Sequence, residues 1–153
     1  MEQKEITIDR LGTLKFDEIG WKTRKTISFF GRNEEITVKI AAYEIEDGIT
    51  AEQLSAVQDF IENEAERLKT VERLLTEHVQ EFLFLSADEA PKRYTPALLI
   101  FEEDGSYALS CDVDVEDLLE DEEKQEDYWH WEENAAVVCI KPDEVVMVED
   151  EYL

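Results

Sequence analysis

The stretch that decides the fold is DGITAEQLSAVQDFIENEAERLKTVERLLTEHVQEFLFL, residues 47–85. Thr50 is followed three positions later by Gln53, a spacing that forms a capping box, in which each side chain bonds a backbone N–H at the helix start. Apolar residues then recur every three or four positions, as on one face of a helix. We therefore predict a helix over residues 50–85. Its apolar stripe consists of Leu54, Val57, Ile61, Ala65, Leu68, Val71, Leu75, Val79 and Phe82.

On the N-terminal side of this helix, residues 4–43 alternate apolar and polar side chains with the two-residue period of half-buried strands. The sequence Gly31-Arg32-Asn33-Glu34 is typical of a hairpin turn. Ile36, Val38 and Ile40 follow it and fall on one face of the returning strand. This segment is predicted to form strands.

On the C-terminal side, residues 97–148 return to strand patterns. The dipeptide Asp104-Gly105 predicts the turn of a second hairpin, and residues 135–140 and 144–148 are two further short apolar runs. Residues 115–127 are left open between helix and loop, because their crowded carboxylates repel one another at helical spacing.

The order of strands, helix and strands predicts an α+β protein. We expect a mainly antiparallel sheet with one long amphipathic helix packed on it, the helix being either continuous or broken in two near Lys69 and Thr70. A homodimer seam is the other use of such an apolar stripe. At 153 residues, the chain is expected to be a single domain over residues 1–153.

The charge of the chain is strongly acidic, with 40 Asp and Glu against 15 Lys and Arg and a net charge of -25. From Tyr94 onward the only basic residues are Lys124 and Lys141. Such a surface repels phosphates and anionic lipid headgroups, so we expect no direct nucleic-acid binding and no membrane binding. A basic protein partner is favoured instead.

The sequence predicts a cytoplasmic location. Its first residues lack the apolar region of a signal peptide, and no apolar run has the length of a membrane span. The two cysteines, Cys111 and Cys139, lie in apolar surroundings without CxxC spacing, which favours buried, reduced thiols.

No pattern of catalytic or cofactor-binding residues stands out, so we expect a protein that is not an enzyme and has no cofactor. A nucleophilic triad and a glycine-rich phosphate loop are both missing. His78 lies in the helical pattern, where a packed histidine is favoured over a catalytic base. Asp112, Asp114 and Glu116 alternate, but without the central glycine of an EF-hand, so no metal site is expected.

The candidate partner-binding residues are the acidic segment and the aromatic residues that follow it. Aromatic side chains within a rim of carboxylates resemble the anchors of protein interfaces, although the tryptophans could instead cover the edge of the core. The candidates are Asp112, Asp114, Glu116, Asp117, Glu120, Asp121, Glu122, Glu123, Tyr128, Trp129, His130 and Trp131.

A series of short motifs carries a resemblance to a known family. In order, the motifs are Leu11-Gly12-Thr13-Leu14-Lys15-Phe16-Asp17, Trp21, Phe29-Phe30-Gly31, Ile49-Thr50 with Gln53, and Phe60 to Asn63. This order resembles a family of small uncharacterised bacterial proteins, a domain of unknown function, over residues 6–85. Some similar proteins are regarded as immunity proteins against bacterial toxins, and the resemblance implies that association.

Three functions remain open from the sequence. The first is an immunity or inhibitor protein whose acidic face covers the basic surface of a toxin, often a nuclease. The second is a cytosolic accessory or small-ligand-binding module that is acidic for solubility. The third is a DNA mimic, whose carboxylates stand in for phosphates.

Overall fold

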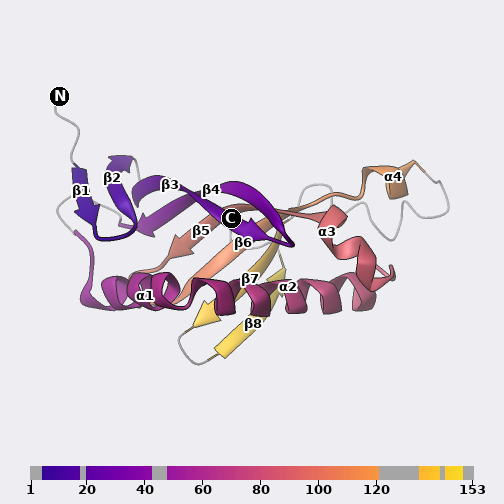
Figure 1. Cartoon of the computed structure of the whole chain (residues 1–153). Helices are drawn as coiled ribbons and strands as arrows, with labels where there is room; N and C mark the ends of the chain where they lie inside the picture. The colour runs from indigo at the N-terminus through magenta and orange to yellow at the C-terminus, as the bar shows by residue number, and fades with distance from the viewer. Residues whose placement is uncertain (1–4, 18–19, 43–47, 121–134, 142–143, 150–153) are drawn as a thin grey trace.

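The computed structural model describes residues 5–17, 20–42, 48–120, 135–141 and 144–149. Its centre is a single eight-stranded sheet, in which the strands lie side by side in the order of the sequence. Two helices run along one face of that sheet (Figure 1). The strands are β1 (Glu5–Ile8), β2 (Gly12–Asp17), β3 (Gly20–Phe29), β4 (Arg32–Ala41), β5 (Tyr94–Phe101), β6 (Tyr107–Val113), β7 (Ala135–Lys141) and β8 (Glu144–Glu149). The helical elements are α1 (Ala51–Glu62), α2 (Glu64–Glu81), the 3₁₀ turn η2 (Ala87–Glu89), α3 (Ala90–Arg93) and α4 (Glu116–Leu119).

The sheet is mixed, because β4 and β5 run parallel with Thr37 opposite Leu98 and Ile40 opposite Phe101. Each of the other neighbouring pairs is antiparallel. The prediction of one long helix on a mainly antiparallel sheet is therefore wrong, although the α+β class stands. The physical reason is the crossover: the chain leaves β4, passes through both helices and returns beside β4 in the same direction.

The helical segment is not continuous, and it breaks at Asn63 and not near Lys69 and Thr70. Asn63 ends α1 and precedes α2; its side-chain amide donates to the carbonyl oxygen of Asp59 at 3.0 Å. An asparagine side chain that bonds the backbone in this way competes with helix hydrogen bonds. The second helix ends at Glu81, short of the predicted residue 85.

The predicted capping box is confirmed at the start of α1. Thr50 Oγ1 accepts a hydrogen bond from the backbone N–H of Gln53 at 3.0 Å, and Gln53 Oε1 accepts one from the N–H of Thr50 at 3.0 Å. The buried Gln53 amide also donates to the carbonyl oxygens of Ala41, at 2.8 Å, and Phe101, at 3.2 Å. One side chain therefore joins the first turn of α1 to the ends of the two parallel strands.

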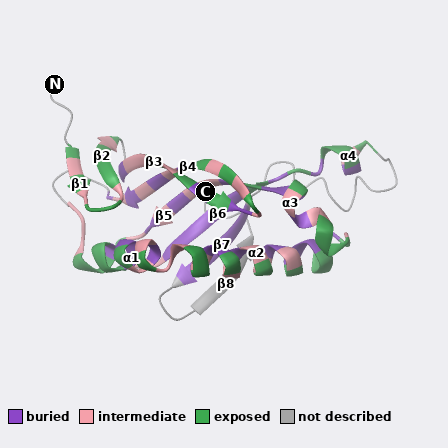
Figure 2. Cartoon of the chain, viewed as in Figure 1, coloured by how far each residue is buried: buried purple, intermediate pink, exposed green. Residues whose placement is uncertain are grey.

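The main core lies between the helices and the sheet face that they cover (Figure 2). The stripe positions Val57, Leu68, Val71, Leu75 and Val79 are buried there, as their spacing predicts. Three other stripe positions, Leu54, Ala65 and Phe82, are exposed. Ala65 lies next to the break at Asn63, and Phe82 follows the end of α2. The opposite sheet face carries a small separate cluster, consisting of Ala108, Val137 and Cys139 with Ile100 beside it.

Within the part of the chain that the structure describes, no helix combines the length and apolar content needed to cross a membrane.

Candidate acidic binding surface

The candidate site is built where β6 ends and the chain turns into α4. The backbone N–H of Asp114 donates to the carbonyl oxygen of Arg93 at 2.7 Å, which holds the end of β6 beside α3. Val115 and Leu118 are buried and anchor α4 to the core. Because apolar and acidic residues alternate here, the carboxylates of Asp114 and Glu116 face solvent.

Arg93 lies at the centre of this part of the molecule. It is buried, with only 7% of its surface exposed. Its guanidinium donates two hydrogen bonds to the Asp117 carboxylate, one of them 3.0 Å long. It also donates to the carbonyl oxygen of Asp114 at 3.2 Å and approaches Glu89 at 3.5 Å. The hydrogen bonds from Arg93 lower the pKa of Asp117, so this carboxylate stays ionised.

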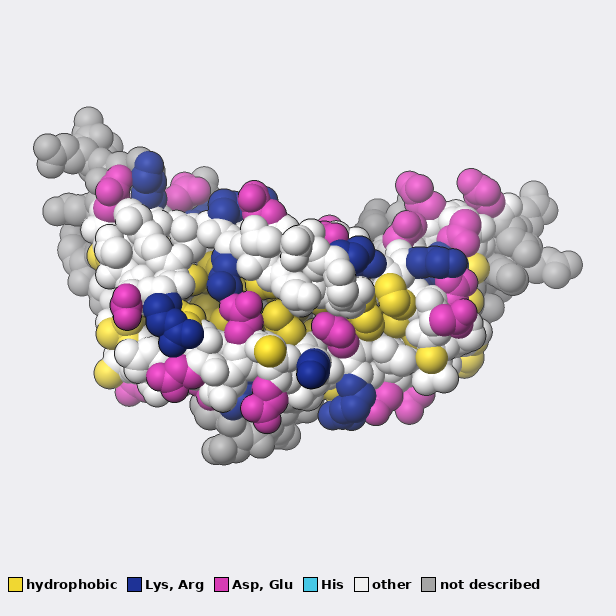
Figure 3. Space-filling view, viewed as in Figure 1, with side chains coloured by type: hydrophobic (Ala, Val, Ile, Leu, Met, Phe, Trp, Pro, Cys, Tyr) yellow, Lys and Arg dark blue, Asp and Glu magenta, His cyan; other side chains and the backbone are white. Residues whose placement is uncertain are grey.

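The other carboxylates at this end surround the ion pair. Six residues together form what we call the acidic end: Glu89, Asp112, Asp114, Glu116, Asp117 and Glu120. No described cation forms an ion pair with Asp112, Asp114, Glu116 or Glu120. All residues of the acidic end except Asp112 line a shallow depression of about 370 Å³, together with Lys92 and Arg93. Figure 3 shows acidic side chains gathered where α3 and α4 lie.

The structure brings together four of the predicted partner-binding residues around this depression: Asp114, Glu116, Asp117 and Glu120. A fifth, Asp112, is exposed near the end of β6 but does not line the depression. The other predicted residues, Asp121, Glu122, Glu123, Tyr128, Trp129, His130 and Trp131, lie outside the described residues. Sequence reasoning missed Glu89 and Arg93, which belong to this surface. The sequence feature that could have pointed to these two residues is the pair of prolines, Pro91 and Pro96. The prolines mark a connection, where side chains from distant strands can meet.

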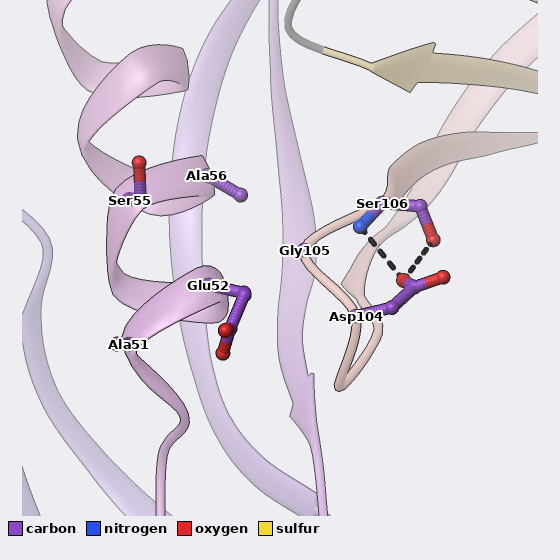
Figure 4. Close-up of a pocket in the computed structure, with 7 residues that line it drawn as sticks. All are labelled: Ala51, Glu52, Ser55, Ala56, Asp104, Gly105 and Ser106. Atoms are coloured by element: carbon purple, nitrogen blue, oxygen red, sulfur yellow. Dashed lines mark hydrogen bonds between the residues drawn. The ribbon is translucent and has the colours of Figure 1, made fainter.

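A second depression, of about 550 Å³, lies between the first turn of α1 and the turn joining β5 to β6 (Figure 4). Its polar side chains are Glu52 and Ser55 on the helix, and Asp104 and Ser106 in the turn. Asp104 Oδ1 accepts hydrogen bonds from the backbone N–H of Ser106, at 2.9 Å, and from its hydroxyl, at 2.6 Å. Among the described residues, no group of His, Cys, Asp and Glu is arranged to hold a metal ion.

The histidine predicted to pack in the core does so. His78 is 2% exposed, and its Nδ1 lies 2.5 Å from the hydroxyl oxygen of Tyr94. The ring of Phe82 stacks on it at a centroid distance of 4.8 Å. Burial lowers the pKa of His78 to about 4, so the imidazole is neutral at physiological pH.

We expect His78 to make the fold sensitive to mild acid. The unfolded chain takes up a proton near pH 6.5 and the native one near pH 4, so the unfolded state binds more protons between these values. Stability contributed by the neutral ring is therefore lost as the pH falls, by about 2 kcal/mol at pH 5. Urea unfolding at several pH values measures this loss. The variant His78→Gln should lack this component, and equal pH dependence in both proteins would contradict the assignment.

The fold and the site define a class: an α+β protein with helices on one face of a mixed sheet and carboxylates concentrated at one end. The chain belongs to the DUF6985 family, a domain of unknown function, whose family model matches residues 10–152. The comparisons with curated proteins and with solved structures found no match.

Proposed function

We propose that this protein is a non-catalytic binding protein whose acidic end covers a basic surface of a partner protein. The observation that carries the proposal is the arrangement around Arg93. Its charge is already used by Asp117, so Asp114, Glu116 and Glu120 remain as exposed carboxylates around one depression. A cationic side chain entering that depression would meet several acceptors at once.

The charge of the whole chain supports the same function. A net charge of -25 creates a negative field that attracts a basic protein and repels nucleic acid and anionic membranes. Complementary charge speeds encounter and orients the partners, and buried anchors supply the affinity. An immunity or inhibitor protein that covers the basic active surface of a bacterial toxin or nuclease, in the cytoplasm, is the form of this function that we favour.

A second candidate is an accessory module that binds a small ligand. The depression of about 550 Å³ beside α1 favours it, because this volume falls within the range of small-molecule sites. Adding a library of small-molecule fragments to the protein in solution, and mapping the shifts of its backbone NMR signals, would detect a ligand bound there.

The proposed function is tested by neutralising the acidic end. We expect the variant Asp114→Asn with Glu116→Gln and Glu120→Gln to associate with the partner about tenfold more slowly. The matched control is Asp9→Asn with Glu62→Gln and Glu103→Gln, which removes equal charge from other exposed positions. The partner is first captured from lysate of the native host and identified by mass spectrometry. Association rates are then measured at about 50 and about 300 mM salt.

The outcome separates local from general charge effects. A basic partner whose association slows in the first variant, and much less in the control, supports the proposal. An acidic or neutral partner, or equal slowing in both variants, contradicts it.

A further inference from the structure

Two aromatic side chains at the end of α2 are exposed to solvent. Phe82 is 49% exposed and Phe84 is 75% exposed. Among the large apolar side chains of residues 5–17, 20–42, 48–120 and 136–140, only Leu54, at 39%, joins them as exposed. We call Phe82 and Phe84 the aromatic patch. Exposed neighbouring aromatic residues are typical of binding surfaces, because rigid rings cover much area with little loss of side-chain entropy.

The backbone of Phe84 makes its exposure more unusual. Phe84 has a φ of 55°, in the left-handed region that a bulky residue rarely adopts. The N–H of Leu85 then returns to the carbonyl oxygen of Val79 at 3.1 Å and closes the end of the helix. Glycine or asparagine usually takes this position after a helix. Neither core packing nor backbone preference therefore accounts for a phenylalanine here.

The other non-glycine residues with positive φ have ordinary explanations. Among the described residues these are Arg10, between β1 and β2, and Phe30, between β3 and β4, both in tight turns of adjacent strands. The ring of Phe30 is partly buried and packs on Phe29 at 4.8 Å. The φ of Phe84 belongs to the closure of α2, where a left-handed residue is common, but glycine or asparagine usually stands there. What calls for an explanation is therefore the exposed phenylalanine ring, which points to a contact beyond this chain.

The end of α2, which carries Phe82, is joined through the core to α3 and the acidic end. Phe82 stacks on His78, and His78 bonds Tyr94. Tyr94 follows Arg93 in sequence, and Arg93 bonds Asp117. Figure 1 shows the end of α2 beside α3, on the same side of the molecule as α4.

Charge determines what this surface can accept. The carboxyl end of α2 carries the negative end of the helix dipole, with the exposed Glu81 added to it. A second copy of this chain would bring another net charge of -25 to the same place, so self-association is opposed. The occupant that fits is a cationic one with an apolar side chain to cover the rings.

We propose that the aromatic patch is the apolar anchor of the partner interface, and that its occupant is an amphipathic basic segment, in which Lys or Arg residues flank a large apolar side chain. This inference rests on the proposed function for the basic character of the partner. It adds the position of the anchor and the chemistry of the recognised segment.

The test is a displayed library of random peptides, each about 16 residues long and able to reach about 50 Å when extended. The library is selected on three proteins. These are the natural chain, Phe84→Asn, and Leu54→Ser as the matched control for loss of an exposed apolar side chain. We expect the natural chain and Leu54→Ser to enrich peptides that combine Lys or Arg with a large apolar residue. Fluorescence anisotropy with an enriched peptide should show about tenfold weaker binding to Phe84→Asn.

A stability measurement separates binding from folding. Because asparagine tolerates a positive φ, Phe84→Asn should unfold at the same temperature as the natural chain or a higher one. A clearly lower unfolding temperature would show that Phe84 serves the fold and would overturn the inference.

The remaining outcomes distinguish this inference from the proposed function. Basic peptides that lack an apolar residue, and that bind Phe84→Asn as tightly as the natural chain, would overturn the anchor and leave the proposed function standing. Equal weakening by Leu54→Ser would also overturn the anchor. Enrichment of acidic or neutral peptides, or no enrichment, would overturn both.

Discussion

Replacing Gln53 with glutamate is expected to destabilise the protein by about 3–5 kcal/mol at neutral pH. The Gln53 amide nitrogen donates to the carbonyl oxygens of Ala41 and Phe101, and the residue is fully buried. A carboxylate in its place would direct negative charge at two acceptors and leave them without a donor. The substitution changes almost no volume, so the loss reports charge and hydrogen bonding.

Urea unfolding of Gln53→Glu at several pH values measures this effect. Burial and the two carbonyl oxygens should raise the pKa of the introduced carboxyl in the native state. The native state then binds the extra proton, so the deficit should grow as the pH rises above about 4. Gln53→Met, which loses the hydrogen bonds without adding charge, is the control and should lack this pH dependence. A deficit independent of pH would contradict the explanation.

Replacing Asp59 with leucine is expected to destabilise the protein by about 3 kcal/mol. Asp59 accepts hydrogen bonds from Arg67, at 2.8 and 3.2 Å, and from the hydroxyl of the buried Tyr107 at 2.6 Å. Burial raises the pKa of Asp59, but the hydrogen bonds and charge of Arg67, with the bond from Tyr107, outweigh it and hold the pKa below its usual value. Without the carboxylate, the hydroxyl of Tyr107 loses this acceptor within the core.

A double-mutant comparison identifies the cause. Tyr107→Phe removes the hydroxyl and should cost only about 1 kcal/mol in the natural background. In the Asp59→Leu background the same change should be neutral or stabilising, because it removes a hydroxyl that has lost its acceptor. Chemical unfolding of the four proteins measures this coupling. Additive losses would show that Asp59 acts through something other than Tyr107.

Local features of the fold were predictable from sequence. The capping box depends only on Thr50 and Gln53, which lie three positions apart, and it forms as predicted. The break at Asn63 was not predicted. An asparagine side chain in a helix can bond either solvent or the backbone of the preceding turn, and the spacing of apolar residues does not show which of the two occurs. The parallel pairing of β4 with β5 was not predictable, because strand periodicity does not encode the direction of the neighbouring strand.

The candidate site shows the same division. The exposed carboxylates follow from alternation, since Val113 and Val115 point inward and leave Asp114 outward. The role of Arg93 required the fold, because its partner Asp117 is 24 residues away. Phe82 was assigned to the buried stripe by its spacing, yet α2 ends at Glu81 and Phe82 is 49% exposed.

The parallel pair of strands also has a consequence for how the chain folds. The strands β1 to β4 form one antiparallel series and β5 to β8 another, so each series can grow from its own turns. Their junction is different, because Ile40 and Phe101 meet only after the intervening helices have closed a long loop. Closing a long loop costs conformational entropy before the contacts between the two strands can stabilise the chain. Such non-local pairing therefore slows folding. We therefore expect the pairing of β4 with β5 to form later in folding than the hairpins within each series.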